Sequence, residues 1–218
     1  MIAETIHQLE QELQGRARLV AVTKTKPVPM LQEAYDAGCR LFGENKVQEM
    51  ADKQPQLPAD VQWHLIGHLQ TNKVKYIAPF VSLIHSVDSL KLLQEINKQA
   101  AKHNRVIDCL LQIYIADEET KFGLSAEEAE ALLKLPELDE LANVRIIGLM
   151  GLATNTDDSE QVRQEFRGLK HLYNTLAGID RPMIRFSELS MGMSGDYHMA
   201  VEEGSTLVRV GSAIFGSR

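Results

Sequence analysis

Eight short apolar runs, each followed by a stretch with helical periodicity, constrain the fold of this chain more than any other feature. A run that is apolar at nearly every position is typical of a strand buried on both faces, and such strands alternate with helices in helix-covered parallel sheets. Eight such units with no strand left over favour a closed (β/α)₈ barrel (a TIM barrel) over an open doubly wound sheet, which usually has fewer strands. The predicted strands cover residues 18–24, 40–45, 61–67, 83–88, 108–115, 144–152, 188–193 and 207–211.

The domain organisation follows from the length of the chain and from the absence of linker segments. The chain has 218 residues, near the lower end for such a barrel, so its loops must be short. No proline- or glycine-rich linker and no low-complexity tract interrupts it. We therefore expect one domain over residues 1–218, with a helix in residues 1–17 before the first strand. The sequence has no evident apolar surface stripe, so we expect a monomer.

The net charge, the N-terminal segment and the length of the apolar runs argue against several classes of partner. The net charge of −7 argues against a general affinity for nucleic acid, but it is compatible with a small anion held by a few local groups. The N-terminus carries acids from Glu4 onward and has no apolar targeting segment, and no run is long enough to span a membrane. These features predict a cytoplasmic protein, in which Cys39 and Cys109 are reduced thiols.

Two lysines follow the first predicted strand. In a strand side chains alternate, so Lys24 shares with Val20 and Val22 the face that points into the barrel mouth. Lys26 has the same parity, but Pro27 follows it and indicates that the strand has ended. An apolar pocket disfavours the charged form of a lysine and frees its amine to attack a carbonyl. A lysine whose head reaches water at the strand end is an alternative of comparable weight.

Two Gly/Ser turns follow the last two predicted strands. Ser194 and Gly195 precede a helical stretch, and Gly211 and Ser212 precede a short apolar segment. Glycine lets backbone N–H groups approach an anion closely, and barrels often hold phosphate at the loops after strands seven and eight. The two turns therefore predict a phosphate site, although each alone could be an ordinary turn or cap.

Several longer motifs carry a resemblance to a known family. They are AVTKTKP (21–27), FGENKVQE (42–49), WHLIGHLQTNK (63–73), HSVDS (85–89), ETKFGL (119–124), GLMGLAT (148–154) and SMGMSGDYHMAVEEGSTLVRVGSAIFG (190–216). In these motifs and their order the chain closely resembles the pyridoxal phosphate homeostasis proteins, relatives of the N-terminal barrel of alanine racemase. The fifth strand departs from the pattern, because it ends Gln112-Ile113-Tyr114 where a QVN-type ending is usual.

The resemblance implies a cofactor and its site. It implies pyridoxal 5′-phosphate (PLP) bound covalently as a Schiff base on Lys24, and an arginine, here Arg209, that faces the pyridine nitrogen. It also implies phosphate contacts from Ser194 and the Gly211-Ser212 turn, with Ser190 close by. The remaining implied positions, near the ring or its lysine, are Asn45, His64 and Ser86.

These expectations favour a carrier over an enzyme. An arginine at the pyridine nitrogen disfavours a proton there and makes the ring a poorer electron sink. We therefore expect a regulator that holds PLP reversibly, releases it to PLP-dependent apo-enzymes and maintains vitamin B6 and amino-acid homeostasis. The alternative is a low-activity PLP-dependent amino-acid racemase with Lys24 as one base and a second base that the sequence does not identify. Tyr114, Tyr197, His64 and His198 have suitable chemistry, but nothing in the sequence places any of them opposite Lys24. A third possibility is an aldolase that uses the Lys24 imine directly on a sugar phosphate.

Two other motifs receive weaker interpretations. His64 and His68 have the spacing of metal ligands on a helix, but they straddle a predicted strand end and no carboxylate motif accompanies them, so no metal site is expected. Lys121, in the predicted loop after the fifth strand, is either a solvated residue or a second site that receives PLP.

Overall fold

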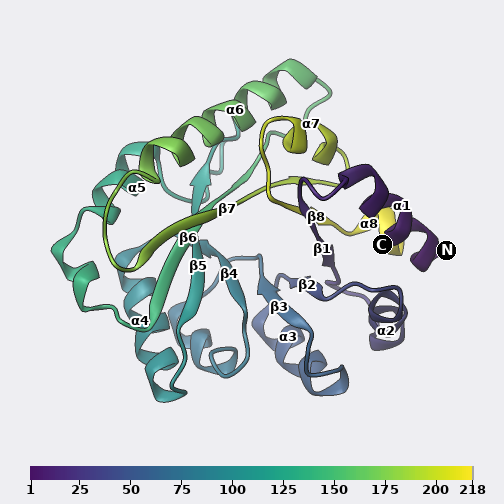
Figure 1. The fold of residues 1–218 in the computed structure, drawn as a ribbon, viewed down its shortest axis with the longest axis horizontal. Coiled ribbons are helices and arrows are strands. Elements are labelled where there is room, and N and C mark those ends of the chain that lie inside the picture. Colours follow the sequence, from purple (N-terminus) through teal and green to yellow (C-terminus); the bar gives the residue numbers. More distant parts are fainter. Residues whose placement is uncertain (218) are drawn as a thin grey trace.

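The computed structural model describes residues 1–217, and over these residues eight parallel strands close into a barrel (Figure 1). The strands pair in sequence order, and β8 pairs with β1 to complete the ring. This architecture confirms the (β/α)₈ fold predicted from the alternation of apolar runs and helical stretches. Because all strands run in one direction, their carboxyl ends meet at one mouth of the barrel, where function is normally found.

The strand bounds differ in detail from the predicted ranges. The strands are β1 (Arg18–Val22), β2 (Leu41–Glu44), β3 (Gln62–Leu65), β4 (Leu83–Val87), β5 (Ile107–Tyr114), β6 (Val144–Leu152), β7 (Ile184–Met193) and β8 (Leu207–Val210). The first strand ends at Val22, two residues before the predicted end, so Lys24 lies in the following turn. The seventh begins four residues earlier than predicted, because Arg185 and Ser187 interrupt the apolar pattern that marks a fully buried strand.

Helices follow the strands and cover the outside of the barrel (Figure 1). The α-helices are α1 (Ile2–Leu13), α2 (Val28–Asp36), α3 (Val47–Lys53), α4 (Leu90–Lys102), α5 (Ala126–Leu133), α6 (Ser159–Leu176), α7 (Tyr197–Glu202) and α8 (Ser212–Phe215), and the 3₁₀ helices are η1 (Gln54–Gln56), η2 (Thr71–Tyr76) and η3 (Pro136–Glu140). Side-chain caps define several starts: Ser89 Oγ accepts from the Leu92 N–H at 3.1 Å, and Ser125 and Glu128 form a capping box.

The core has two layers, as side-chain alternation along buried strands requires. Five inward side chains fill the centre of the barrel: Val20, Leu83, Leu110, Met150 and Leu207. The alternate positions, such as Phe42 and Val208, belong to the much larger cluster between the strands and the helices. Cys39 and Cys109 are buried as free thiols, and burial raises the pKa of both. They are therefore poor nucleophiles.

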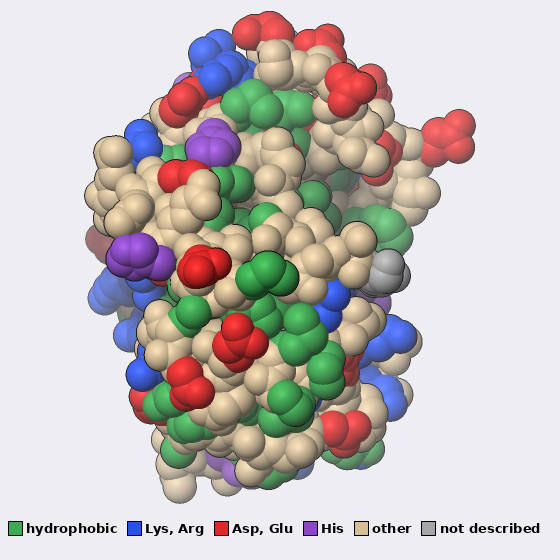
Figure 2. Space-filling model, turned by 90° about the vertical axis from the view of Figure 1, so that its right-hand side faces the viewer, with side chains coloured by type: hydrophobic (Ala, Val, Ile, Leu, Met, Phe, Trp, Pro, Cys, Tyr) green, Lys and Arg blue, Asp and Glu red, His purple; other side chains and the backbone are tan. Residues whose placement is uncertain are grey.

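The outer surface carries mixed charge. The face with α1 and the chain ends shows small hydrophobic areas interspersed with acidic and basic side chains (Figure 2). No helix within residues 1–217 is long and apolar enough to cross a membrane.

Candidate functional site

Lys24 and Lys26 have different surroundings although they are two residues apart. Lys24 is half-buried in the turn between β1 and α2, and its amine makes no hydrogen bond or ion pair within residues 1–217. The Lys26 amine instead donates to the carbonyl oxygens of Phe215 (3.3 Å) and Gly216 (3.0 Å) at the end of α8. Lys26 is thus held as a helix cap, whereas the Lys24 amine has no partner within residues 1–217.

The two Gly/Ser turns predicted to hold phosphate lie together beside this lysine turn. The Gly211 N–H, after β8, donates to Ser194 Oγ, after β7, at 3.3 Å. A Cβ at Gly211 would lie 3.1 Å from Val22 Cβ and 3.2 Å from the Val22 carbonyl oxygen. Glycine therefore allows the end of β8 to contact the end of β1, two residues before Lys24. Ser212, the first residue of α8, is exposed next to this contact.

Arg209 is a buried cation inside the barrel. It alternates with the outward residues Val208 and Val210, and it is only 3% exposed. Its guanidinium donates to Ser190 Oγ and, at 2.9 Å, to the Gly151 carbonyl oxygen, but no carboxylate in the described part of the chain pairs with it. Burial lowers the pKa of Arg209 to about 10, against a weaker opposing effect of Asp196, so the group stays charged at neutral pH. A buried cation without an acidic partner suits an electron-rich ligand atom.

A chain of hydrogen bonds connects Arg209 to two buried histidines. Ser190 Oγ lies 2.9 Å from His85 Nδ1, and His85 Nε2 lies 2.9 Å from His64 Nδ1. Burial lowers the pKa of His64 to about 3, helped by the charge of Arg18. Burial, with smaller electrostatic effects of the neighbouring His64 and Arg209, also places the pKa of His85 well below its ordinary value. Both rings are therefore neutral at physiological pH.

His85 is not among the site residues that the sequence predicts, whereas Ser190 is expected close to the phosphate. The Ser190 hydroxyl is hydrogen-bonded to Arg209 and His85 inside the barrel. In the sequence, His85 stands out only as the first residue of the HSVDS motif. Its position two residues after the inward Leu83 is the signal that could have identified it.

Asn45 and Ser86 offer polar groups at two further strand ends. Asn45 is half-buried directly after β2, and a Cβ at Gly67 would come within 2.3 Å of its carbonyl oxygen, so Gly67 must be glycine for this approach. Asn45 also lines a cleft together with His68 and Lys73. Ser86 Oγ in β4 is buried and has no hydrogen-bond partner among the described residues. An unpaired buried hydroxyl is costly, and a bound ligand could satisfy it.

Two of the side chains considered as a second base face away from the barrel centre. The Tyr197 hydroxyl donates to Glu12 on α1, and His198 Nε2 lies 3.6 Å from the same carboxylate. The Tyr114 ring, at the end of β5, has the Lys121 ammonium 5.1 Å from its centre. His64 is bonded to His85 as described above. None of these contacts prepares a base opposite Lys24.

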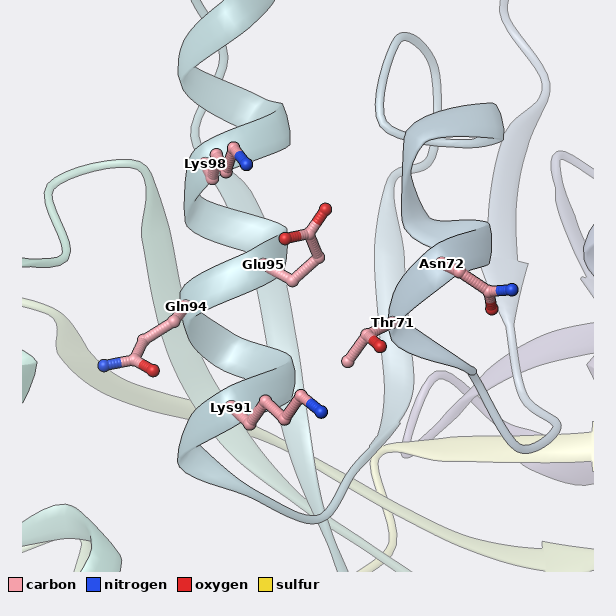
Figure 3. A pocket seen from close by; sticks show the side chains of 6 residues that line it. All are labelled: Thr71, Asn72, Lys91, Gln94, Glu95 and Lys98. Atoms are coloured by element: carbon pink, nitrogen blue, oxygen red, sulfur yellow. The ribbon is translucent and has the colours of Figure 1, made fainter.

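A surface groove on the outer layer is separate from these residues. It lies between η2 and α4, with Glu95 and Thr71 facing each other across it (Figure 3), and its lining residues are Thr71, Asn72, Lys91, Gln94, Glu95 and Lys98. None of the predicted site residues lines it. Within residues 1–217, no group of three or more histidine, cysteine or acidic side chains is placed to hold a metal ion.

Comparisons with known proteins agree with the sequence motifs. The family described as alanine racemase, N-terminal domain, matches residues 1–218. The pyridoxal phosphate homeostasis protein of Aquifex aeolicus is 42% identical over 203 residues, which cover 93% of this chain and 87% of that protein. PipY of Synechococcus elongatus PCC7942 superposes with a TM-score of 0.92 in its structure without PLP and 0.89 in its structure with PLP bound. Both PipY comparisons have 37% identity and cover 99% of this chain and 100% of that chain.

Fold and matches together define a barrel of the alanine racemase N-terminal class. The predicted family is confirmed: this chain belongs to the pyridoxal phosphate homeostasis protein family.

Proposed function

We propose that this chain binds PLP at the barrel mouth, with the aldehyde on Lys24, the phosphate at Ser194 and the Gly211-Ser212 turn, and the pyridine nitrogen toward Arg209. The observation that carries the proposal is the contact of Gly211 with Val22. This contact places the hydrogen-bonded Ser194–Gly211 pair beside Lys24, whose amine has no partner within residues 1–217. The PLP-bound PipY structure, at 37% identity, supports the same ligand.

The donor groups on this chain fit such a ligand. Backbone N–H groups at glycine, together with serine hydroxyls, are ordinary phosphate partners. Arg209 is a buried cation without an acidic partner, and the buried Ser86 hydroxyl lacks a hydrogen bond, so both gain from a polar ligand beside them. Asn45 and His64 contribute to the polar lining near the ring and its lysine. The side chains present therefore suit PLP chemically.

Lys24 supplies a reversible covalent link. Its neutral amine forms a bond to the aldehyde carbon, and the aldehyde oxygen leaves as water with the two hydrogens of the amine. Hydrolysis reverses the step and releases free PLP, and no oxidant or reductant is involved. A carrier needs this reversibility, because the ligand must be held and then surrendered.

Regulation of the free PLP level is the function that this site supports best. The cation at Arg209 disfavours protonation of a nearby pyridine nitrogen, which weakens carbanion chemistry. Tyr197 and His198 are bound to Glu12 outside the barrel, so they do not serve as a second base. We propose that the chain holds PLP, delivers it to PLP-dependent apo-enzymes and thereby maintains vitamin B6 and amino-acid balance, without strong catalysis of its own.

Visible absorption spectra of the wild type and the Lys24→Ala and Lys26→Ala variants test this proposal. We expect a Schiff-base band on addition of PLP to the wild type and to Lys26→Ala, and none with Lys24→Ala. Borohydride reduction followed by peptide mass spectrometry should place the ligand on Lys24. A band that survives in Lys24→Ala would refute the site. Rapid racemisation of an amino acid by the loaded wild type would favour the racemase-like alternative, and cleavage of a sugar phosphate by colourless protein would favour the aldolase.

A further inference from the structure

A buried charge cluster lies directly behind the Lys24 turn. Lys53, the last residue of α3, has a side chain that is only 9% exposed. Its ammonium donates to Glu44 Oε1 at 2.7 Å, Glu49 Oε1 at 2.6 Å and the Thr23 carbonyl oxygen at 2.8 Å. These three acceptors match the three N–H donors of a lysine, so the ammonium is fully satisfied.

The cluster binds the backbone on both sides of Lys24. The Thr23 hydroxyl donates to Glu44 Oε1 at 2.6 Å, and the Thr25 N–H donates to Glu49 Oε1. Thr25 has a φ of 65°, a left-handed conformation that is costly for a β-branched residue. The hydrogen bond to Glu49 therefore helps to hold the chain in a conformation that it would not adopt by preference.

The cluster approaches the turn from outside the barrel. Phe42 packs in the outer core and Leu41 against the inner cluster, so alternation places Glu44 on the outer face of β2. The contacts fix Thr23 and Thr25 from this side, while the Lys24 amine remains without a partner in the described part of the chain. The backbone of the turn is fixed and its reactive group is left available.

Stability alone is a weak explanation for such a cluster. Burial raises the pKa of Glu44, against the lowering effects of Lys53 and Thr23, and one oxygen of this carboxylate has no hydrogen bond among the described residues. A well-packed apolar group in place of a buried ion pair is often neutral or stabilising. The contacts of Lys53 and Glu49 instead converge on the residues flanking Lys24.

We propose that Lys53 and Glu49 are positioning residues that hold the Lys24 turn for attack on the ligand aldehyde. This inference rests on the proposed function, because it concerns the same lysine and the same ligand. Neither residue touches the ligand. They act through Thr23 and Thr25, and orientation of this kind changes the covalent step more than it changes the noncovalent hold on the phosphate.

Two ligands separate positioning from a general loss of structure. Pyridoxine 5′-phosphate carries an alcohol where PLP carries the aldehyde, so it reports on the phosphate and ring contacts without a Schiff base. Dissociation constants for both ligands should be measured on the wild type and on the Glu49→Ala, Glu49→Gln, Lys53→Met and Lys24→Ala variants. Glu49 has a side chain that is 23% exposed, so its substitutions should fold even where Lys53→Met does not.

We expect Glu49→Ala and folded Lys53→Met to bind PLP about tenfold more weakly, because small misplacements of a reacting group carry large costs. Their affinity for pyridoxine 5′-phosphate should stay within about twofold of the wild type. Glu49→Gln keeps the acceptor oxygen and should restore PLP binding. Equal weakening of both ligands in Glu49→Ala, or no weakening of either, would overturn the inference.

Two further variants complete the design. Arg145→Met breaks a surface ion pair with Asp108, at the opposite end of the barrel, and should change neither affinity. Lys24→Ala tests the proposed function itself and should abolish any preference for PLP over pyridoxine 5′-phosphate. If that preference survives in Lys24→Ala, the proposed function fails. If it is lost there but unchanged in Glu49→Ala, only the positioning inference fails.

Discussion

The guanidinium of Arg209 and the hydroxyl of Ser190 are hydrogen-bonded in the interior of the barrel, 19 residues apart in sequence on the neighbouring strands β8 and β7. No carboxylate within residues 1–217 forms an ion pair with this arginine. The hydrogen bond therefore leaves the positive charge of Arg209 unneutralised near the proposed ligand site, and burial of this charge has a desolvation cost in the free protein.

Replacement of Arg209 should separate stability from ligand binding. Arg209→Met removes a buried charge and keeps an unbranched apolar side chain, so we expect the unfolding temperature of the free protein to be retained or raised. The affinity for PLP should fall by about tenfold or more, because a hydrogen bond to a charged group contributes about 1.5–3 kcal/mol. Thermal unfolding with and without PLP measures both effects. An undiminished thermal shift on PLP addition would show that Arg209 does not face the ligand.

The His64–His85 pair should make the protein sensitive to acid. The pKa of His64 is lowered from 6.5 to about 3, and that of His85 is also well below 6.5, so below pH 6.5 the unfolded chain binds protons that the folded chain does not. The stability that these groups contribute is present above pH 6.5 and is lost as the pH falls toward 3. Each buried neutral histidine adds up to about 1.4 kcal/mol per pH unit to the slope of the free energy of unfolding against pH.

Urea denaturation from pH 8 to pH 4 checks the histidine prediction. His85→Asn keeps a polar group near Ser190 but removes one titrating ring, so the free energy of unfolding should depend less on pH in this variant than in the wild type. The surface variant His171→Asn removes an exposed imidazole and serves as the control. Identical pH slopes for His85→Asn and the wild type would contradict the prediction.

A methyl group at Gly211 should push the end of β8 away from the end of β1 at the proposed ligand site. Gly211→Ala places a Cβ 3.1 Å from Val22 Cβ, tighter than most such contacts, and should weaken the binding of both PLP and pyridoxine 5′-phosphate by about tenfold. Gly168→Ala, in the middle of α6 with nothing within 4 Å of the added Cβ, is the matched control. It should leave both affinities unchanged and raise stability by about 1 kcal/mol, because alanine favours the helix. Fluorescence titration and urea denaturation of the two variants test this contrast.

Loss of the Lys26 ammonium should affect stability more than covalent chemistry. Lys26→Met removes the donor to the carbonyl oxygens at the end of α8 and should lower the free energy of unfolding by about 1 kcal/mol. The Schiff-base band with PLP should persist. A lost band with unchanged stability would reverse the roles that we assign to Lys24 and Lys26.

The sequence predicts the barrel well because most strand positions are buried on both faces, so that each strand contains a local apolar run. The end of β1 is less well predicted, since Thr23 and Lys24 keep strand parity although the chain turns after Val22. The third unit has the 3₁₀ helix η2 after its strand, where alternation alone suggests a full α-helix.

The contacts of the candidate site are harder to predict than the residues themselves. Lys24, Arg209 and Gly211 lie at or just after the carboxyl ends of strands, which local patterns locate. The bond between His85 and Ser190 joins residues 105 positions apart, and no local pattern encodes such a pair. Glu49 and Lys53 look like an ordinary helical ion pair in the sequence. Their role emerges only when α3 packs beneath the turn that carries Lys24.

The pairing of β8 with β1 places the proposed ligand site where the two ends of the chain meet. Lys24 and Gly211 lie on opposite sides of the seam at which the barrel closes, and α1 and α8 lie side by side there (Figure 1). Contacts between such distant parts of a sequence form at a high entropic cost. A ligand bound as proposed would contact both sides of this seam. Its binding free energy would then add to the stability of the closed barrel, so the unfolding temperature should rise with ligand concentration.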